Sequence, residues 1–135
     1  MKRYIARIAV ATSLLAALTV AGCATSGTDL KRNQIVEIEK TSSSYARVGV
    51  VGAYQEDSTI SVHGIVIRKR AGRSPIPGHV DVELRGPAGD ILDSVSVAYR
   101  PTAKRRSGIF WATLDGVAPV GSTIRVSHDP GSRAE

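Results

Sequence analysis

The sequence predicts an all-β fold, a single small antiparallel sandwich of about six to seven strands. Six apolar stretches rich in Val, Ile or aromatic residues follow one another, and Gly, Pro, Asp or Ser bounds each of them. No helical period lies between these stretches, which leaves a sandwich or a small barrel. The 135 residues include one cysteine, so an intrachain disulfide is excluded and the hydrophobic core must supply the stability.

The N-terminus predicts a helical signal peptide over residues 1–22. Three cations, Lys2, Arg3 and Arg7, precede 14 uncharged residues from Ile8 to Ala21. A helix that spans the hydrocarbon core needs about 20 apolar residues, so an export signal is favoured over a permanent anchor. Without the signal the basic residues fall from 18 to 15 against 12 acidic residues, and the formal charge falls from +6 to +3.

The end of the apolar run, Val20-Ala21-Gly22-Cys23, resembles the lipobox of bacterial lipoproteins. The resemblance implies cleavage between Gly22 and Cys23 and acylation of Cys23, which would tether the chain to a membrane. Ala24 follows the cysteine where an Asp commonly retains lipoproteins at the inner membrane, so the resemblance implies the inner leaflet of the outer membrane, facing the periplasm. The alternative is an ordinary secretory signal in which the cysteine has no role.

Residues 23–44 are expected to form the lipidated cysteine and a flexible tether, because they are small and polar at both ends. Within them, Ile35 to Glu39 alternates like a short strand, although a helical face also fits, and we expect a weak edge strand. The sandwich is expected over 45–129 and a disordered tail over 130–135.

Six strands are expected in the domain where apolar residues cluster, and turn-forming residues separate each strand from the next. Pro75, Pro77 and Gly78 break the chain before the third, and Pro101 ends the fourth because proline cannot donate to a ladder. A hairpin turn is expected at Gly86 to Asp90, and another follows the fifth strand at Asp115-Gly116. The six predicted strands run over Val48 to Tyr54, Ile60 to Arg68, Val80 to Arg85, Ile91 to Tyr99, Gly108 to Leu114 and Ser122 to His128.

Alternation assigns most strand faces. Val80, Val82 and Leu84 are expected to point inward. In the second strand the apolar phase changes near Gly64, which predicts a bulge there. The fifth strand is apolar on both faces, so either the Ile35 to Ile38 segment covers its outer face, which we favour, or Trp111 is an exposed contact point.

Two basic loops are expected at one end of the domain, because antiparallel neighbours reverse the chain at alternating ends. The tether is expected to enter at that end, beside the loops, which predicts contact with anionic headgroups or an acidic partner. Solvated loops that only maintain solubility are the alternative. The cations are Arg68, Lys69, Arg70 and Arg73 in one loop, and Lys104, Arg105 and Arg106 in the other.

The sequence offers candidate residues for a metal site but no catalytic motif. His79 and His128 are expected at that same end with Asp81 and Asp129 near them, which makes the two histidines weak metal candidates, although no metal-ligand spacing motif is present. No G-x-S-x-G motif supports a hydrolase, so we expect no enzyme and no cofactor. A nucleic-acid partner is not expected, since recognition patterns are lacking.

The domain resembles immunoglobulin-like or fibronectin-type-III-like sandwiches of uncharacterised exported bacterial proteins, and more distantly transthyretin-like domains. The resemblance implies a binding or spacer module. We therefore expect a membrane-anchored periplasmic lipoprotein with a non-catalytic binding or structural module, and a periplasmic metal-binding protein is the alternative. The segments that carry the resemblance are Ile76 to Leu84, Gly89 to Leu92, Gly108 to Phe110 and Pro119 to Val126.

Overall fold

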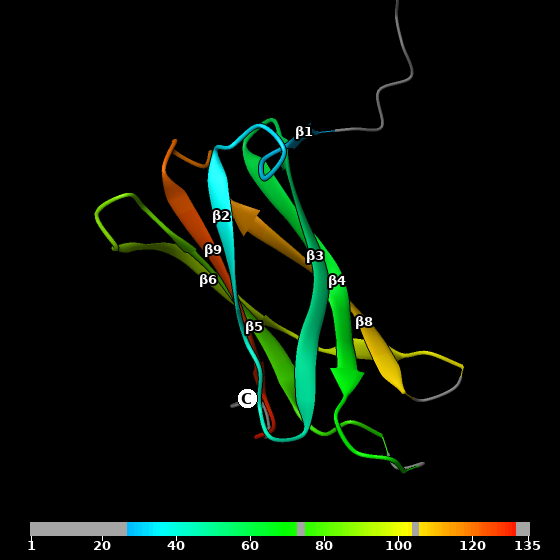
Figure 1. Cartoon of the computed structure of the whole chain (residues 1–135). Coiled ribbons are helices and arrows are strands. Elements are labelled where there is room, and N and C mark those ends of the chain that lie inside the picture. Colours follow the sequence, from blue (N-terminus) through cyan, green and yellow to red (C-terminus); the bar gives the residue numbers. More distant parts are fainter. Residues whose placement is uncertain (1–26, 73–74, 104–105, 132–135) are drawn as a thin grey trace, which may run out of the picture.

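Two β-sheets pack face to face in the computed structural model, which describes residues 27–72, 75–103 and 106–131 (Figure 1). One sheet has five strands in the order β1-β3-β4-β8-β7, and the other has four in the order β2-β9-β5-β6. The all-β sandwich is thereby confirmed, although the described residues form nine strands in place of the predicted six to seven, and one pair of neighbouring strands is parallel. The strands are β1 Thr28–Asp29, β2 Val36–Thr41, β3 Ala46–Glu56, β4 Thr59–Arg68, β5 His79–Arg85, β6 Ile91–Val97, β7 Tyr99–Pro101, β8 Ser107–Asp115 and β9 Ser122–Asp129.

The strand order is that of immunoglobulin-like sandwiches. The series β3-β4-β8-β7 corresponds to strands A, B, E and D, and β9-β5 corresponds to F and C, with β6 in the position of an added C′ strand. The position next to β9 is taken by β2, which pairs with it in parallel from Val36↔Ser122 to Thr41↔Ser127. The predicted edge strand is therefore confirmed, and it completes the four-stranded sheet.

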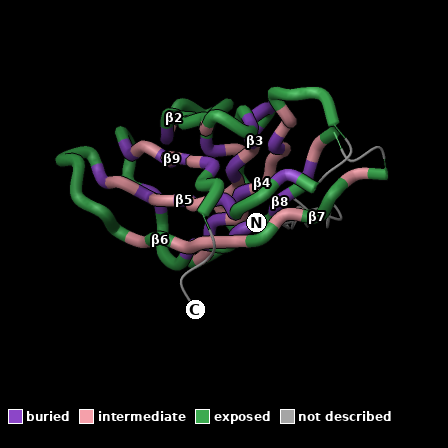
Figure 2. The backbone as a smooth tube through the Cα atoms, turned by 90° about the horizontal axis from the view of Figure 1, so that it is seen from below, coloured by how far each residue is buried: buried purple, intermediate pink, exposed green. Residues whose placement is uncertain are grey.

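The core lies between the sheets and is made by alternate residues of each strand. Val80, Val82 and Leu84 of β5 are buried as predicted, and Phe110 and Leu114 of β8 face them from the other sheet. Figure 2 shows this alternation of buried and more exposed residues along the strands. Because apolar side chains recur every second residue, the pleat alone sends one row of each strand into the core.

The bulge predicted at Gly64 is wrong in its position. The β4–β8 register runs continuously from Thr59↔Asp115 to Ile67↔Ser107, whereas the β3–β4 register shifts between Val48 and Val51. The extra residue therefore lies in β3. Gly64 keeps the inward phase of its strand, and a Cβ there would come within 2.7 Å of Cζ of Phe110, so that ring occupies the space of the missing side chain.

The predicted fourth strand, Ile91 to Tyr99, is two strands. It ends as β6 at Val97 and resumes as β7 at Tyr99, and the two belong to different sheets. The side chain of Tyr99 packs against the core, and its hydroxyl donates to the carbonyl of Ile76. The chain thus changes sheets at Ala98, a step that alternation within a single stretch does not reveal.

The boundary expected at residue 45 is wrong, because residues 28–41 of the predicted tether belong to the sandwich. Leu30 is 1% exposed, and its backbone N–H donates to the carbonyl of Ala53 at 3.0 Å. Val36 of β2 is also buried. Pro130 and Gly131, assigned to the tail, follow β9 directly, and Gly131 makes specific hydrogen bonds. The signal peptide, Cys23 and residues 132–135 lie outside the described residues.

The chain does not enter beside the basic loops, which corrects a second expectation. β1 pairs Thr28 with Gln55 and Asp29 with Tyr54, at the end of β3 that is remote from Ala46. In Figure 1 β1 lies at the top, and the loop that follows β4 lies at the bottom. Gly27 and the basic loops therefore occupy opposite ends of the long axis of the sandwich.

Candidate functional site

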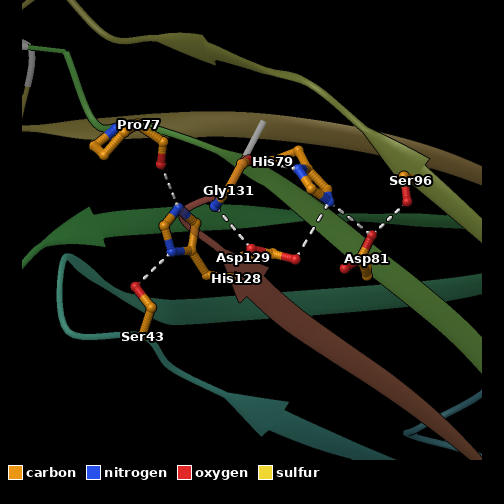
Figure 3. Close-up of polar contacts among 8 residues, drawn as sticks. All are labelled: Ser43, Pro77, His79, Asp81, Ser96, His128, Asp129 and Gly131. Atoms are coloured by element: carbon orange, nitrogen blue, oxygen red, sulfur yellow. Dashed lines mark hydrogen bonds and ion pairs between the residues drawn. The ribbon is translucent and has the colours of Figure 1, made fainter. Parts of the chain in front are cut away.

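Three side chains converge on the outer surface of the four-stranded sheet, where β5 begins and β9 ends. His79 and Asp81 lie two residues apart on β5, and Asp129 on β9 is the direct pairing partner of His79. Nε2 of His79 lies 3.1 Å from Oδ1 of Asp81 and 3.9 Å from Oδ2 of Asp129 (Figure 3). These three residues, named here the His–Asp cluster, offer ligand atoms that all lie within 4.8 Å of one another.

Gly131 orients two members of the His–Asp cluster. Its carbonyl oxygen lies 3.2 Å from Nδ1 of His79, and its N–H donates to Oδ1 of Asp129 at 2.8 Å. A carbonyl only accepts, so Nδ1 of His79 carries the hydrogen. Ser96 of β6 donates its hydroxyl hydrogen to Oδ1 of Asp81. Each ligand is therefore held by a second group.

His128 does not join His79, which corrects the predicted histidine pair. Its Nε2–H donates to the carbonyl of Pro77 at 3.0 Å, and its Nδ1 accepts from the hydroxyl of Ser43 at 2.7 Å. Both ring nitrogens are thus committed, and the side chain fastens the loop that precedes β3 to the loop that precedes β5. The signal for this was in the sequence, since His128 continues the buried row of Ile124 and Val126 whereas Asp129 alternates outward.

Burial lowers the pKa of His128. The hydrogen bond to Pro77 and the charge of Asp129 act in the opposite direction, and a positive charge on a protonated His79 would add to the lowering. The residue His128 as a whole is 5% exposed. Oγ of Ser43 already accepts from the N–H groups of Tyr45 and Ala46. A proton on Nδ1 would therefore face a hydroxyl oxygen that has no free acceptor position.

We expect the folded domain to lose stability as the pH falls below about 6.5, the ordinary pKa of histidine. In that range the unfolded chain binds a proton at His128 that the folded chain does not bind, so the free energy of unfolding decreases with decreasing pH. Urea denaturation in EDTA at pH 8 and pH 5.5 measures the difference. The variant His128→Gln should show a weaker dependence of the unfolding free energy on pH, whereas the control variant His63→Gln should behave like the wild type. If His128→Gln keeps the wild-type pH dependence, His128 is not the group responsible.

The basic loops do converge in the part of the chain that the structure describes. The N–H of Arg68 donates to the carbonyl of Arg106 at 2.8 Å, and the N–H of Lys69 donates to the carbonyl of Tyr45 at 3.0 Å. Arg70 lines the same surface pocket as these cations. Arg73, Lys104 and Arg105 fall outside the described residues.

The outer face of the five-stranded sheet carries an exposed apolar surface, and the expected cover is wrong. The Ile35 to Ile38 segment belongs to the other sheet, so Trp111 is 65% exposed and Ile109 is 47% exposed. Val50, at the bulge of β3, is 79% exposed. The ring of His63 lies between those of Tyr54 and Trp111, at centroid distances of 5.2 and 5.3 Å. We call this surface the Trp111 face.

Comparisons add no family to these observations, because the chain has no significant match among protein-family models, curated proteins or solved structures. Among the described residues, no helix has the length and apolar character needed to cross a bilayer.

Proposed function

We propose that this chain is a lipid-anchored, non-catalytic binding module of the bacterial cell envelope, and that the Trp111 face binds a protein partner. The exposure of Trp111 and Ile109 on β8, together with that of Val50 on β3 two strands away, carries the proposal. Contiguous exposed apolar surface is uncommon on monomers and often marks an interaction site. Tryptophan is also among the residues that dominate binding energy at protein interfaces.

The chemistry of the Trp111 face suits a protein better than a charged ligand. Its centre is built from Val, Ile and aromatic side chains on three adjacent strands, and hydroxyl side chains such as Thr113 and Ser61 lie further along the same face. An apolar centre with a polar margin is typical of protein interfaces. The backbone beneath is hydrogen bonded into the sheet, so little conformational entropy would be lost when a partner binds.

The proposal of a lipid anchor rests on the resemblance of residues 20–23 to a lipobox. If Cys23 is anchored, the position of β1 decides which end of the sandwich faces the membrane. Gly27 is four residues from Cys23, a separation of at most about 14 Å in an extended chain. The 11 residues of β3 extend about 37 Å from the β1 end toward the basic loops. We therefore assign the loops of Arg68 and Arg106 to an acidic surface of a partner rather than to the headgroups around the anchor.

Intact mass of the protein extracted from cell membranes tests the anchor. We expect the mass of residues 23–135 plus acyl chains, and we expect Cys23→Ala to abolish acylation and membrane retention. A wild-type protein of unacylated mass would contradict the anchor while leaving the Trp111 face to be tested separately.

Site-specific photocrosslinking in cells tests the Trp111 face. A photoreactive residue at Thr113, which is exposed beside Trp111, should give one discrete adduct with another protein. The matched control is Ser94, exposed on the outer face of the four-stranded sheet, where we expect no such adduct. A dimer of this chain in place of the adduct, or equal crosslinking at both positions, would contradict the proposal.

Trp111→Ser should abolish the Thr113 adduct and change the free energy of unfolding by about 1 kcal/mol or less, since an exposed ring loses mainly its contact with His63. Urea denaturation and crosslinking of the same variant separate a binding role from a stabilising role. A large loss of stability would show that the ring acts in folding.

A further inference from the structure

We propose that the His–Asp cluster binds one divalent transition-metal ion, with Nε2 of His79 and one carboxylate oxygen each from Asp81 and Asp129 as ligands. The site lies on the four-stranded sheet, whereas the Trp111 face belongs to the five-stranded sheet. The proposal is therefore independent of the function proposed above, and either can fail without the other.

The orientation of His79 is the first argument. Because Gly131 accepts the hydrogen of Nδ1, the lone pair of Nε2 in the neutral ring points toward two carboxylates. A lone pair that faces two anions is unfavourable unless a positive charge lies between them. Histidine ligands of metals typically donate their other N–H to a backbone carbonyl or a carboxylate, as His79 does here.

The supporting groups are the second argument. The N–H of Gly131 binds one oxygen of Asp129 and leaves the other directed toward His79, and Ser96 binds Asp81 (Figure 3). The imidazole is almost fully buried, with its side chain 8% exposed. A buried ring between two paired strands is positioned before any ion arrives, which reduces the entropy lost on binding.

The spacing of the ligand atoms is the third argument. Metal–ligand bonds to nitrogen and carboxylate oxygen are about 2.0–2.2 Å long, so two ligands of one ion lie at most about 4 Å apart. The observed distances from Nε2, 3.1 and 3.9 Å, fall in that range. The ligand oxygens of Asp81 and Asp129 lie within 4.8 Å of each other, and the 51% exposed side chain of Asp129 has room to turn toward the ion about its hydrogen bond to Gly131. The same exposure leaves one side of the ion open to solvent.

The donor set selects the class of ion. An imidazole nitrogen with two carboxylates suits Zn²⁺, Fe²⁺ or Mn²⁺, whereas Ca²⁺ and Mg²⁺ prefer oxygen ligands alone. Two carboxylates and a neutral imidazole carry a charge of −2, which a divalent cation neutralises. Three protein ligands also leave a coordination position for water or for a ligand from a partner, as in exchangeable or catalytic sites rather than closed structural sites.

Zinc binding to the protein purified from its native cells, with or without detergent as its anchoring requires and carrying no histidine tag, tests the proposal. Competition with a chromophoric chelator should show one Zn²⁺ per chain, and Co²⁺ in place of Zn²⁺ should give visible absorption bands of nitrogen and oxygen coordination. Asp129→Asn keeps an oxygen for the N–H of Gly131 but removes the carboxylate charge. We expect it, like His79→Gln, to weaken Zn²⁺ binding at least tenfold.

Two matched variants serve as controls. Asp115→Asn removes an exposed carboxylate at the other end of the domain, and His63→Gln removes the histidine of the Trp111 face. Both should bind Zn²⁺ like the wild type. The proposal is overturned if the wild type binds no Zn²⁺, which would mean that a proton alone fills the cluster, or if Asp129→Asn binds as tightly as the wild type. Because Asp129 is exposed, that variant remains informative even if His79→Gln fails to fold.

Discussion

Phe110→Ala is expected to lower the free energy of unfolding by about 3–5 kcal/mol, the usual range for deleting a buried aromatic ring. Phe110 is the largest fully buried side chain among the residues that the structure describes, at 1% exposed, and it belongs to the hydrophobic core between the two sheets. Its ring fills the space above Gly64 on the neighbouring strand. Removal would leave a cavity that the rigid, hydrogen-bonded sheet closes only in part. Urea denaturation of the variant measures the loss.

The pairing of Phe110 with Gly64 makes the prediction more specific. A Cβ at residue 64 would lie 2.7 Å from Cζ of Phe110 and 2.8 Å from the carbonyl oxygen of Val50. Gly64→Ala should therefore cost about 1–3 kcal/mol through overpacking. In the double variant with Phe110→Leu, part of that cost should disappear because the smaller side chain yields space.

The adjacent residue on β8 supplies the control. Trp111 is of similar size but lies on the outer face, so Trp111→Ser should cost far less than Phe110→Ala. Equal losses at the two positions would contradict the assignment of faces, and additive effects of Gly64→Ala and Phe110→Leu would contradict direct contact between them.

Local pattern was sufficient to predict the longer strands and the inward row of β5, because the period of two is a property of consecutive residues. Local pattern failed wherever the arrangement of a strand depends on a pairing partner that is distant in sequence. The sheet that β2 joins depends on β9, more than 80 residues later, and this decides whether Trp111 is covered. The exchange of sheets at Ala98 likewise depends on which strand β7 meets.

The apparent phase change in β4 shows a different kind of failure. Ile65 and Ile67 are apolar but half-buried on the Trp111 face, so β4 has apolar residues on both faces. A hydrophobic pattern cannot distinguish that arrangement from a bulge. The real bulge, in β3 beside Val50, is specified by pairing with β4 rather than by the residues of either strand alone.

The candidate site was predicted in part. Antiparallel order was sufficient to place His79 near Asp129, and both carboxylates of the His–Asp cluster were expected near the histidines. The role of Gly131 is not evident from the sequence, because residues 130–135 carry no strand pattern and predict a disordered tail, whereas Gly131 bonds to His79 and Asp129. The strand-end argument places His79 and His128 at the same end of the domain but does not say which way each side chain points, and the alternation along β9 turns the ring of His128 inward.

Gly78→Ala is expected to cost more than about 3 kcal/mol, the second large effect. Gly78 precedes β5 with a φ of +101°, a conformation that L-residues rarely adopt. A Cβ there would lie 1.9 Å from the carbonyl oxygen of Asp129 and 2.6 Å from Cα of Pro130. Both are backbone atoms, so β9 would have to move away from the start of β5, which would also disturb the hydrogen bonds of Gly131. Urea denaturation measures the cost.

The variant Gly89→Ala measures the cost of backbone strain alone, without the steric overlap that a Cβ at residue 78 would have with the end of β9. Gly89 has a φ of +87° in the turn between β5 and β6, and a Cβ there meets no atom within 4 Å. It should lose only the roughly 1–2 kcal/mol of an alanine with positive φ. The excess loss in Gly78→Ala then measures the close approach of the two chain segments. Equal losses in the two variants would mean that backbone strain alone requires glycine at residue 78 and that the segments beside the His–Asp cluster are free to separate.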